Sequence, residues 1–568
     1  MTEQNNYCFT DTAVTVLKER YLLKDPDTGE QETIPDMFRR VAFCVAAGDI
    51  EKADRYYTMM MNRDFLPNSP TLMNAGKEGK AGQLSACYVL PVEDSMEGIF
   101  EALKNMAVIH KSGGGTGFNF SNLRHKGARV GTTNGLASGP VSFMGLFDQA
   151  TECVMQGGMR RGANMGILDI DHPDILEFIE AKGSGQLTNF NLSIGMTDEF
   201  MKNLDDPWNH DLWMRIVRNA WKSGDPGLVF LDEVNRHNHA PELGDISATN
   251  PCGECPMHSF EACNLGSINL SNFVEESPYY YYTPHTYQFE GRYIDLDRLA
   301  YTVTQAVEFL NGVIDANHYP LPEIESRVKE LRTIGLGVMG WADTLNKLGI
   351  RYGSEESFKL ADFLMSYING RAHDASKGRN AAVTCIAPTG TISLIAGCSS
   401  GIEPLFALEY DRVAFDKDAD ADGTSHRKVL HYVDPNYQEA LEAQDIRLSD
   451  GIFVTANEVT WKEHIDMLST FQKYTDLAVS KTINMPNSAT VDDVSEAYIY
   501  AWQRGCKGIT IFRDGCLGTQ VLYRKDPESA PEEVGVEGDV CPECGSTSIV
   551  RESGCKKCTT CGWSPCAI

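Results

Sequence analysis

The sequence predicts an α/β fold with a parallel core, which could be an open sheet or a closed barrel. Short apolar runs recur along the chain, amphipathic helical stretches separate many of them, and no internal repeat of fixed period is present. This alternation is typical of parallel sheets in which helices connect neighbouring strands. The runs cover residues 166–170, 228–231, 265–270, 334–338, 382–386 and 508–512.

Composition narrows the class of protein. The 568 residues are 42% hydrophobic and 23% charged, as in a globular protein. Lysine and arginine number 50 against 79 acidic residues, so the net charge is 50 − 79 = −29, which argues against nucleic acid and anionic membranes as partners. No secretory signal or membrane-length apolar run is visible, and we expect a cytoplasmic location.

The chain divides into four predicted parts. Residues 1–60 carry a helical apolar pattern and form an N-terminal helical segment, and residues 61–525 form the α/β core. Residues 526–540 are acidic, contain Pro and Gly, lack aromatic side chains, and are predicted to be a disordered linker. Residues 541–568 form a cysteine-rich tail.

One helix can be predicted in detail. Asp94 or Ser95 is suited to cap its start, and glycines at 113–115 are suited to end it. Large apolar side chains recur at helical spacing and are interpreted as core. They are Met96, Ile99, Phe100, Leu103 and Met106.

The segment 250–255, Asn-Pro-Cys-Gly-Glu-Cys, is chemically the most informative. Its Pro and Gly disfavour a helix, so we expect extended backbone in which Asn250, Cys252 and Glu254 share one face. A thiol between an amide and a carboxylate suits sulfur chemistry on a hydroxylated substrate. The alternatives are a zinc site or a thiol redox motif formed by the C-x-x-C pair with His258 and Cys263.

Three loops contain candidate ligand-binding residues. Residues 156–163 combine glycines with Arg160 and Arg161, which suits a phosphate, although a mobile surface loop has the same composition. Residues 387–393 follow an apolar run and can present amides and hydroxyls to a phosphate. Residues 111–117 resemble a phosphate loop only weakly, and the acidic loop at 418–423 lacks the last ligand of a calcium loop.

The tail holds two C-x-x-C-G motifs, which predict a four-thiolate zinc ribbon. The predicted zinc ligands are Cys541, Cys544, Cys558 and Cys561. Cys555 and Cys566 are then left without a metal.

Taken together, the chain resembles the adenosylcobalamin-dependent, class II ribonucleotide reductases. Several motifs carry the resemblance in family order, at residues 68–76, 85–87, 157–163, 250–254, 387–393, 398–404 and 505–514, followed by the cysteine-rich tail. The resemblance implies a ten-stranded α/β barrel of two five-stranded parallel halves, with the radical cysteine on an internal loop. It also implies adenosylcobalamin as the cofactor.

The resemblance implies a role for each residue of the motif. Cys252 becomes the thiyl radical that takes the ribose 3′ hydrogen, Glu254 accepts the 3′-hydroxyl proton, and Asn250 binds the sugar hydroxyls. Cys87 and Cys263 supply the reducing equivalents and end as a disulfide, which requires their Cα atoms to lie within about 7 Å.

The resemblance also implies binding residues and partners. A ribonucleotide substrate would place its phosphate at Ser69, Ala387, Pro388, Thr389, Gly390, Thr391 and Ser393. A deoxynucleotide effector would lie near Asp94, Arg124, Gln156 and Arg160. A thioredoxin-like protein would be the external reductant, with Cys555 and Cys566 carrying electrons from it to the buried pair.

Some alternatives remain open at the level of sequence. The radical could come from a separate metal-bearing subunit, as in class I reductases, although the usual Tyr-Tyr pair near the C-terminus is missing. No glycyl-radical motif of a class III enzyme is visible. A non-catalytic zinc-ribbon interaction protein is a further alternative. The sequence does not decide between diphosphate and triphosphate substrates, or between a monomer and a homodimer.

Overall fold

The structure is a computed structural model. It describes residues 9–25, 28–77, 82–131, 135–154, 162–276, 286–289, 291–415, 427–443, 445, 447, 450–516, 522–524, 549–552 and 555–558. The chain divides into two compact units, one of residues 1–406 with 443–516 and one of residues 407–442 with 517–568. In the described part of the chain, no helix is both long and apolar enough to span a bilayer.

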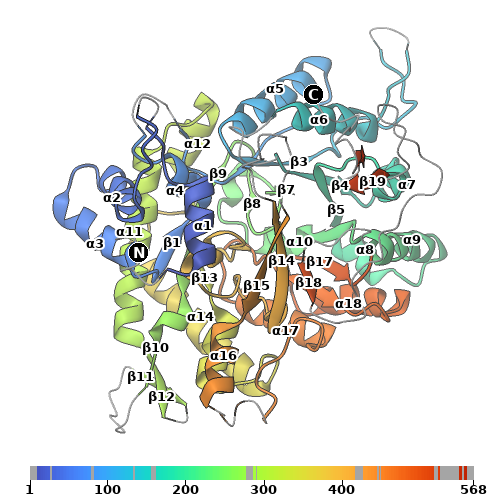
Figure 1. Cartoon of the computed structure of the whole chain (residues 1–568). Helices are drawn as coiled ribbons and strands as arrows, with labels where there is room; N and C mark the ends of the chain where they lie inside the picture. The colour runs from blue at the N-terminus through green and yellow to red at the C-terminus, as the bar shows by residue number, and fades with distance from the viewer. Residues whose placement is uncertain are drawn as a thin grey trace. The chain divides into compact units, whose positions relative to one another are not determined.

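A ten-stranded sheet forms the centre of the larger unit, with helices around it (Figure 1). Its strands are β1 (Phe65–Pro67), β2 (Cys87–Val89), β3 (Gly115–Asn119), β4 (Asn164–Asp169), β5 (Phe190–Met196), β6 (Gly227–Phe230), β9 (Ala262–Asn269), β13 (Ile334–Met339), β16 (Thr482–Met485) and β17 (Gly508–Arg513). Strands β2 to β6 pair in sequence order and all in parallel.

The remaining strands complete a circuit. Strand β17 pairs antiparallel with β6 and parallel with β16, while β9 pairs antiparallel with β2 and parallel with β13. Single parallel bridges, Leu336 to Thr384 and Ile386 to Val479, connect β13 through residues 382–386 to the segment that leads into β16. The pairings therefore join two parallel halves through the antiparallel contacts β6–β17 and β2–β9, and β1 adds antiparallel to β9. The predicted α/β class with a ten-stranded sheet is confirmed.

Five of the six apolar runs are strands, namely β4, β6, β9, β13 and β17. Every residue of β9 and β13 is buried, as expected for strands covered on both faces, although β9 also buries the polar residues Asn264, Ser267 and Asn269. The sixth run, 382–386, makes only the single bridges at Thr384 and Ile386.

Helices cover the sheet of the larger unit. They are α1 (Asp11–Arg20), α2 (Ile34–Val45), α3 (Ile50–Met61), α4 (Ser69–Asn74), α5 (Met96–Lys111), α6 (Pro140–Cys153), α7 (Ile175–Glu180), α8 (Asp198–Lys202), α9 (Pro207–Ser223), α10 (Leu231–Arg236), α11 (Leu296–Ala316), α12 (Pro322–Leu331), α13 (Trp341–Leu348), α14 (Glu355–Ser376), α15 (Ile392–Ala396), α17 (Trp461–Gln472) and α18 (Val491–Gln503). Short 3-10 turns lie at Lys182–Ser184, Pro241–Leu243 and Leu270–Phe273.

Local chemistry sets many helix ends. The Ser95 side chain accepts from the Gly98 amide at the start of α5, as predicted, and the Thr490 side chain forms a capping box with Asp493 at the start of α18. One part of the α5 prediction is wrong. Met96 and Phe100 are 56% and 48% exposed, because α5 buries only the face that carries Ile99, Met106 and Ile109.

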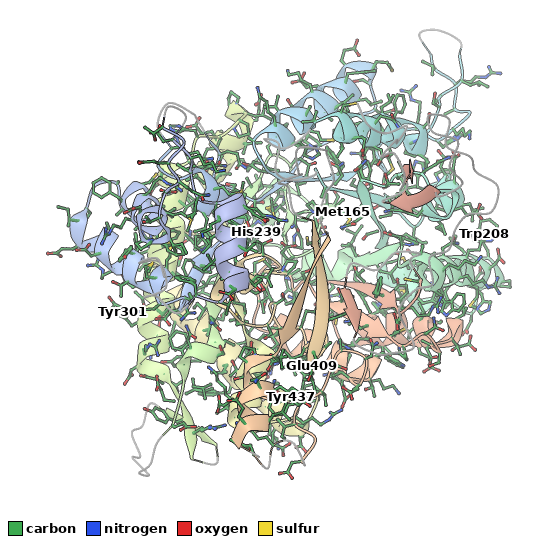
Figure 2. The ribbon with its side chains drawn as sticks, viewed as in Figure 1. Met165, Trp208, His239, Tyr301, Glu409 and Tyr437 are labelled. Carbon is green, nitrogen blue, oxygen red and sulfur yellow. The ribbon has the colours of Figure 1, made fainter. Side chains whose placement is uncertain are left out.

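Figure 2 shows how the side chains of the larger unit are layered. Met165 of β4 and His239 lie toward the middle of the view; Met165 is buried, and the His239 side chain is 4% exposed. Trp208 and Tyr301 lie at the periphery, where they are 65% and 56% exposed. Two small sheets lie outside the circuit, one formed by β7 (Ala248–Thr249) and β8 (Pro256–Met257), the other by β10 (Val274–Glu276), β11 (Thr286–Phe289) and β12 (Arg292–Asp295).

The smaller unit contains two antiparallel sheets. Its strands are β14 (Glu409–Phe415), β15 (Arg427–Val433) and β18 (Leu522–Arg524) in one sheet, and β19 (Ile549–Glu552) and β20 (Cys555–Cys558) in the other. Helix α16 (Pro435–Ala443) lies at its boundary. Cys541, Cys544, Cys561 and Cys566 lie outside the described residues, as do the predicted linker 526–540 and the acidic loop 418–423.

Candidate active site

Residues 250–255 form the turn of the β7–β8 hairpin, so the prediction of an extended segment is wrong. Gly253 has φ +80°, and its amide donates to the Asn250 carbonyl oxygen at 3.0 Å. Proline is suited to begin a turn and glycine to adopt a left-handed conformation. Pro251 and Gly253 together therefore favour the turn. Cys252 therefore lies at the tip of a turn, where its residue is exposed.

Glycines on β3 allow this hairpin to lie against the sheet. A Cβ atom at Gly117 would lie 1.7 Å from the carbonyl oxygen of Thr249, and one at Gly115 would lie 2.9 Å from the Pro251 ring. Asn191 of β5 holds the turn by donating to the Pro251 carbonyl oxygen at 2.8 Å. The glycine-rich run 111–117 thus provides space for the hairpin. Its weak resemblance to a phosphate loop did not predict this role.

Three predicted catalytic side chains converge beneath the turn. The Asn250 amide nitrogen lies 3.0 Å from Cys87 Sγ, and Glu254 Oε1 lies 4.0 Å from the same sulfur. All three residues are buried, with Glu254 only 2% exposed. The Asn250 oxygen accepts from the Cys255 amide at 2.9 Å, which fixes the orientation of the Asn250 side chain.

Cys87 and Cys263 are direct partners in the antiparallel pairing of β2 with β9. Opposed residues in such a ladder have Cα atoms about 4.5–5.5 Å apart, which meets the requirement for a disulfide. Both thiols are free and buried. Burial raises the pKa of the Cys263 thiol.

A cavity of about 280 Å³ lies in front of these groups. It is lined by Asn68, Ser69, Pro70, Ala86, Cys87, Gly113, Gly115, Ala163, Asn250, Pro251, Cys252, Glu254, Leu265, Gly266, Ser267, Ala387, Pro388, Thr389, Gly390, Thr391 and Ile392. The segments that contribute are far apart in the sequence, and Cys263 lies behind Cys87 outside the lining.

The family model described as "Ribonucleotide reductase, barrel domain" matches residues 85–210, 208–378 and 377–512. The model "Ribonucleotide reductase, all-alpha domain" matches residues 7–80. The chain belongs to the ribonucleotide reductase family. The family predicted from the sequence motifs and its reaction, ribonucleotide reduction, are confirmed, and the alternative of a non-catalytic zinc-ribbon protein is not supported.

Among curated relatives, a "Vitamin B12-dependent ribonucleoside-diphosphate reductase" of Thermoplasma acidophilum is 46% identical over 84% of this chain and 67% of the relative. A protein of the same name from Mycobacterium tuberculosis is 41% identical over 91% of this chain and 81% of the relative. The solved structure of the Actinobacillus ureae class Id ribonucleotide reductase alpha subunit covers 91% of this chain and 99% of its own, with a TM-score of 0.72 and 21% identity. That structural similarity shows the fold.

In this reductase the loop 387–391 is held in a defined shape. Thr389 has φ +55°, and its hydroxyl accepts from the Gly401 amide at 2.7 Å. Ser393 lies in α15 and contacts Ser400 Oγ at 3.0 Å, so it lies outside the cavity lining. The loop is therefore braced by residues that follow it in the chain.

Ser69 begins α4 at the cavity, and its hydroxyl lies 2.7 Å from the Tyr21 hydroxyl. The sequence interpretation missed Tyr21, because it ends the N-terminal helix α1 and carries no motif of its own. It also assigned no role to Asn68, whose side chain accepts from Leu265 N at 3.1 Å and donates to Leu84 O at 2.9 Å. The available signals were the place of Asn68 at the start of the motif 68–76 and its position beside Ser69.

Two predicted effector residues of the reductase lie together on its surface. Arg124 Nε is 2.9 Å from Asp94 Oδ2, and both side chains are more than one-third exposed. Gln156 and Arg160 lie outside the described residues.

The alternative zinc set around Cys252 is not assembled. His258 donates its amide to Glu261 at 3.0 Å, and its ring contacts Asn238 at 3.0 Å. In the described part of the chain, the group whose ligand atoms come within 4.8 Å of one another is Cys87, Glu254 and Cys255. Cys252 is absent from that group.

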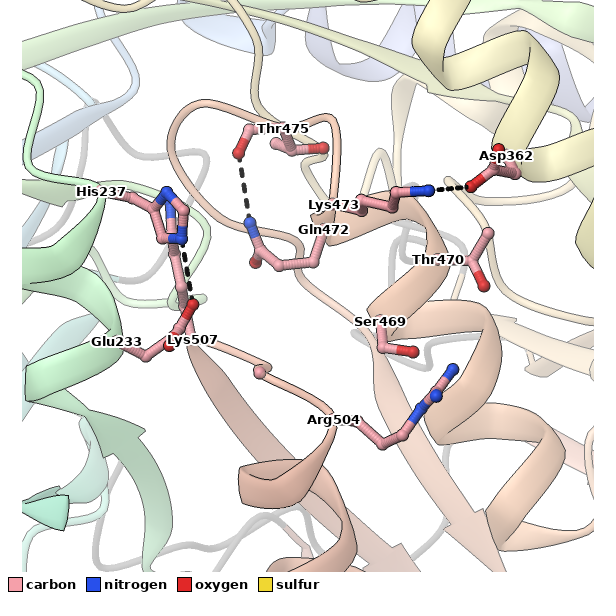
Figure 3. Close-up of a pocket in the computed structure, with 11 residues that line it drawn as sticks. Glu233, His237, Asp362, Ser469, Thr470, Gln472, Lys473, Thr475, Arg504 and Lys507 are labelled. Atoms are coloured by element: carbon pink, nitrogen blue, oxygen red, sulfur yellow. Dashed lines mark hydrogen bonds and ion pairs between the residues drawn. The ribbon is translucent and has the colours of Figure 1, made fainter.

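A second cavity, of about 530 Å³, is lined by charged residues (Figure 3). Lys473 pairs with Asp362 at 2.7 Å, and the His237 ring lies 3.1 Å from the Glu233 carboxylate. Burial lowers the pKa of Lys507 to about 8, and its ammonium group donates to the Asp476 carbonyl oxygen. None of the predicted catalytic, binding or metal-ligating residues lines this cavity, although Gly505 and Lys507 of the motif 505–514 do.

Proposed function

We propose that this chain converts ribonucleoside diphosphates into 2′-deoxyribonucleoside diphosphates by thiyl-radical chemistry, with adenosylcobalamin as the radical source. The observation that carries the proposal is the convergence of Cys252, Asn250, Glu254 and Cys87 on one cavity, with Cys263 opposite Cys87. The two curated relatives, named as vitamin B12-dependent diphosphate reductases, support the cofactor and the phosphate form.

Cys252 is the residue that reacts first with substrate. Its thiyl radical removes the 3′ hydrogen atom from the ribose, and the thiol returns a hydrogen atom to the same carbon at the end of the cycle. Glu254 accepts the 3′-hydroxyl proton, since this buried residue lines the cavity that receives the sugar. The Asn250 amide, held by the Cys255 backbone, donates to a sugar hydroxyl.

Cys87 and Cys263 provide the two electrons of the reduction. The C2′–O bond breaks, the oxygen leaves as water, and the two thiols lose two hydrogen atoms as they form one disulfide. The β2–β9 pairing supports this step, because it holds the two cysteines opposite one another without any domain movement. Only Cys87 of the two lines the cavity, so it is the thiol that faces the substrate.

The position of Cys252 fits a radical-forming cofactor. Cys252 is exposed, whereas Cys87 and Cys263 are buried. A radical generated on a cofactor bound outside the site therefore reaches Cys252 before the other two cysteines. When bound, adenosylcobalamin supplies the radical chemistry that converts the Cys252 thiol into a thiyl. A separate metal-bearing subunit is the competing source, and the B12-dependent relatives favour the cobalamin.

The substrate phosphates bind at one side of the cavity, between Ser69 and the loop 387–391. The Ser69 and Thr391 hydroxyls and the loop amides provide donors without adding net charge. Such a site is suited to an anionic substrate in a chain whose net charge is −29. Ser393, outside the lining, supports the loop through its contact with Ser400.

A deoxynucleotide effector binds near Asp94, Arg124, Gln156 and Arg160 and sets substrate preference. The exposed Asp94–Arg124 pair supports the proposal, because a ligand phosphate can compete for the guanidinium. Arg124→Gln should weaken effector-dependent changes in substrate preference at least several-fold. Lys104→Gln, which alters an exposed ion pair with Glu101 on α5, should not. Equal responses in the two variants would contradict the assignment.

The tail carries electrons to the buried pair. Zinc bound by Cys541, Cys544, Cys558 and Cys561 would hold a small fold that presents Cys555 and Cys566 for exchange. The described backbone places Cys555 and Cys558 at opposite ends of β20, in a hairpin with β19, and this arrangement is compatible with different roles for the two residues.

A double variant tests the tail proposal. Cys555→Ser with Cys566→Ser should lose turnover with thioredoxin and keep it with a small penetrating dithiol, while retaining zinc. If the variant loses zinc and Cys558→Ser with Cys561→Ser keeps it, the two roles are exchanged. Normal thioredoxin-dependent turnover by the double variant would contradict the relay.

Anaerobic turnover of the purified chain tests the main proposal. We expect deoxynucleotide formation to require adenosylcobalamin and a dithiol, and diphosphates to react faster than triphosphates. Activity that depends instead on an added metal-bearing subunit would overturn the cobalamin assignment. No product from either phosphate form would overturn the function.

A further inference from the structure

Four free and buried thiols gather behind the candidate active site. They are Cys87 on β2, Cys255 before β8, Cys263 on β9 and Cys385 in the segment 382–386. Cys255, Cys263 and Cys385 are each 0% exposed, and Cys87 is 5% exposed. The proposed function uses only Cys87 and Cys263, so two thiols of this cluster have no assigned role.

The two additional thiols contact one another. Cys255 Sγ lies 3.5 Å from Cys385 Sγ, and Cys385 Sγ also donates to the Glu254 carbonyl oxygen at 3.3 Å. This distance is too long for a bond but allows one after small side-chain rotations, because bonded sulfurs lie about 2.05 Å apart. The pair is therefore arranged as a reduced dithiol.

The additional pair also lies beside the catalytic pair. Cys255 Sγ lies within 4.8 Å of Cys87 Sγ, and the Cys255 thiol interacts with the Cys263 thiol. Gly335 of β13 lies beside Cys263 and Cys385. A Cβ atom at position 335 would lie 3.2 Å from Cys263 Sγ and 2.9 Å from the Cys385 Cβ. The missing side chain therefore leaves room for Cys263 Sγ and for the Cys385 side chain beside β13.

Sulfur chemistry distinguishes this cluster from ordinary packing. A buried cysteine commonly acts as a small apolar side chain, but an isolated one has no second thiol with which to exchange. Here Cys255 Sγ lies 3.5 Å from Cys385 Sγ and within 4.8 Å of Cys87 Sγ, Cys87 lies opposite Cys263, and a carboxylate is present. Glu254 places an oxygen within 4.8 Å of both Cys87 Sγ and Cys255 Sγ.

We propose that Cys255 and Cys385 are a second, internal dithiol that re-reduces the Cys87–Cys263 disulfide in place and so stores the reducing equivalents for one further turnover. The inference rests on the proposed role of Cys87 and Cys263. It adds a redox function to two residues that the family motifs do not include.

The exchange balances without any further reductant. Cys255 attacks the Cys263 sulfur of the disulfide, the Cys87–Cys263 bond breaks, and Cys87 leaves with the electron pair. Glu254 takes the proton from Cys255 and delivers it to Cys87. Cys385 then attacks Cys255 and releases Cys263, which receives the Cys385 proton. The products are two catalytic thiols and one Cys255–Cys385 disulfide.

Burial keeps this second dithiol protonated between turnovers. It raises the pKa of Cys385 to about 12 and that of Cys255 well above its usual range. A protonated thiol reacts slowly with external oxidants. The Cys87–Cys263 disulfide, once formed beside the second dithiol, is therefore the partner with which it exchanges.

Product stoichiometry tests the proposal. The full-length chain is fully reduced, freed of reductant, and mixed anaerobically with adenosylcobalamin and excess ribonucleoside diphosphate. Cys385→Ser and Cys385→Ala should each form about one deoxynucleotide fewer per active site than the unaltered chain. Cys506→Ser, which alters a thiol 1% exposed outside this cluster, should match the unaltered chain.

Disulfide mapping provides a second readout that needs no variant. After the burst, the tryptic fragment 237–292, which holds Cys255 and Cys263, should be linked to the fragment 380–412, which holds Cys385. This link should be missing in Cys385→Ser, although Cys398 lies in the same fragment. Linkage only to fragment 81–104, which holds Cys87, would overturn the proposal, as would equal bursts in all forms.

The same experiment separates this inference from the proposed function. If no form of the protein produces deoxynucleotide, the proposed function fails. If the Cys385 variants still form deoxynucleotide in their first turnover, the proposed function holds. The presence or absence of one additional deoxynucleotide per active site then tests the internal dithiol alone. Retention of the extra equivalent by both Cys385 variants would overturn the inference.

Discussion

Cys87 lies opposite Cys263 across the antiparallel β2–β9 ladder, at the point where the two parallel halves of the sheet meet. Backbone pairing, and not a flexible loop, therefore sets the distance between the two thiols. A pair held in this way can cycle between dithiol and disulfide with little change in the sheet.

Cys263→Ser should abolish multiple-turnover reduction, because the hydroxyl cannot complete the disulfide. The fold should persist, since serine is close in size to cysteine. The measurement is deoxynucleotide formation with a small dithiol, compared with Cys506→Ser as the buried-thiol control. Similar activity in the two variants would show that Cys263 is not part of the redox pair.

Cys252→Ser should remove activity without loss of stability. The residue is exposed at the tip of a turn, so the substitution removes little packing, but a hydroxyl does not readily become a hydrogen-abstracting radical. Turnover and the thermal midpoint are the measurements. Measurable turnover by a clean preparation would contradict the assignment of Cys252 as the radical residue.

Glu254→Gln should lower kcat by about 10²–10⁴, the usual contribution of a positioned general base. The amide preserves the shape of the side chain, which is 2% exposed, but cannot accept the 3′-hydroxyl proton. Nucleotide binding, measured separately, should change little. A kcat equal to that of the unaltered chain at neutral pH would rule out Glu254 as the base.

Gly117→Ala should displace the catalytic hairpin. The added methyl would lie 1.7 Å from the Thr249 carbonyl oxygen, so β3 and β7 must separate. We expect a loss of about 1–3 kcal/mol in the free energy of unfolding, together with a large loss of kcat. Gly145→Ala, at a position on α6 with open space around it, is the control. Equal stability and activity in the two variants would contradict this role of Gly117.

His373 should make the stability of the larger unit depend on pH. Its hydrogen bond with Asp476 raises the pKa of His373, and the same contact helps to lower the pKa of the Asp476 carboxyl against the opposing effect of burial. The His373 contribution is present below its unfolded pKa of about 6.5 and is lost as pH rises through the folded value. The Asp476 contribution is lost only as pH falls through its lowered folded pKa.

Thermal unfolding of His373→Gln at several pH values checks this expectation. The unaltered chain should be more stable than the variant at pH 5.5, by less than about 1 kcal/mol because the ring is partly exposed. The difference should shrink by pH 8.5. Asp476 also accepts the amides of Val383 and Thr384, which lead to the loop 387–391. A difference that grows with pH would contradict the ion-pair explanation.

Local sequence determined much of the molecule. Apolar-rich runs identified β9 and β13, because strands covered on both faces carry mostly apolar side chains. Ser95 identified the start of α5, since a side-chain cap acts within one turn of helix. The motif around Cys252 identified the chemistry, because a thiol next to an amide and a carboxylate indicates the same kind of reaction in an extended segment or in a turn.

Only tertiary structure decided how these parts meet. The alternation assumed for Asn250, Cys252 and Glu254 was wrong, because hairpin pairing and the left-handed Gly253 turned the segment. Tyr21 reaches Ser69, and Cys385 reaches Cys255, through contacts between segments that no local pattern connects. Local patterns reflect backbone preference and burial over a few residues, whereas these contacts depend on how distant strands and helices pack together.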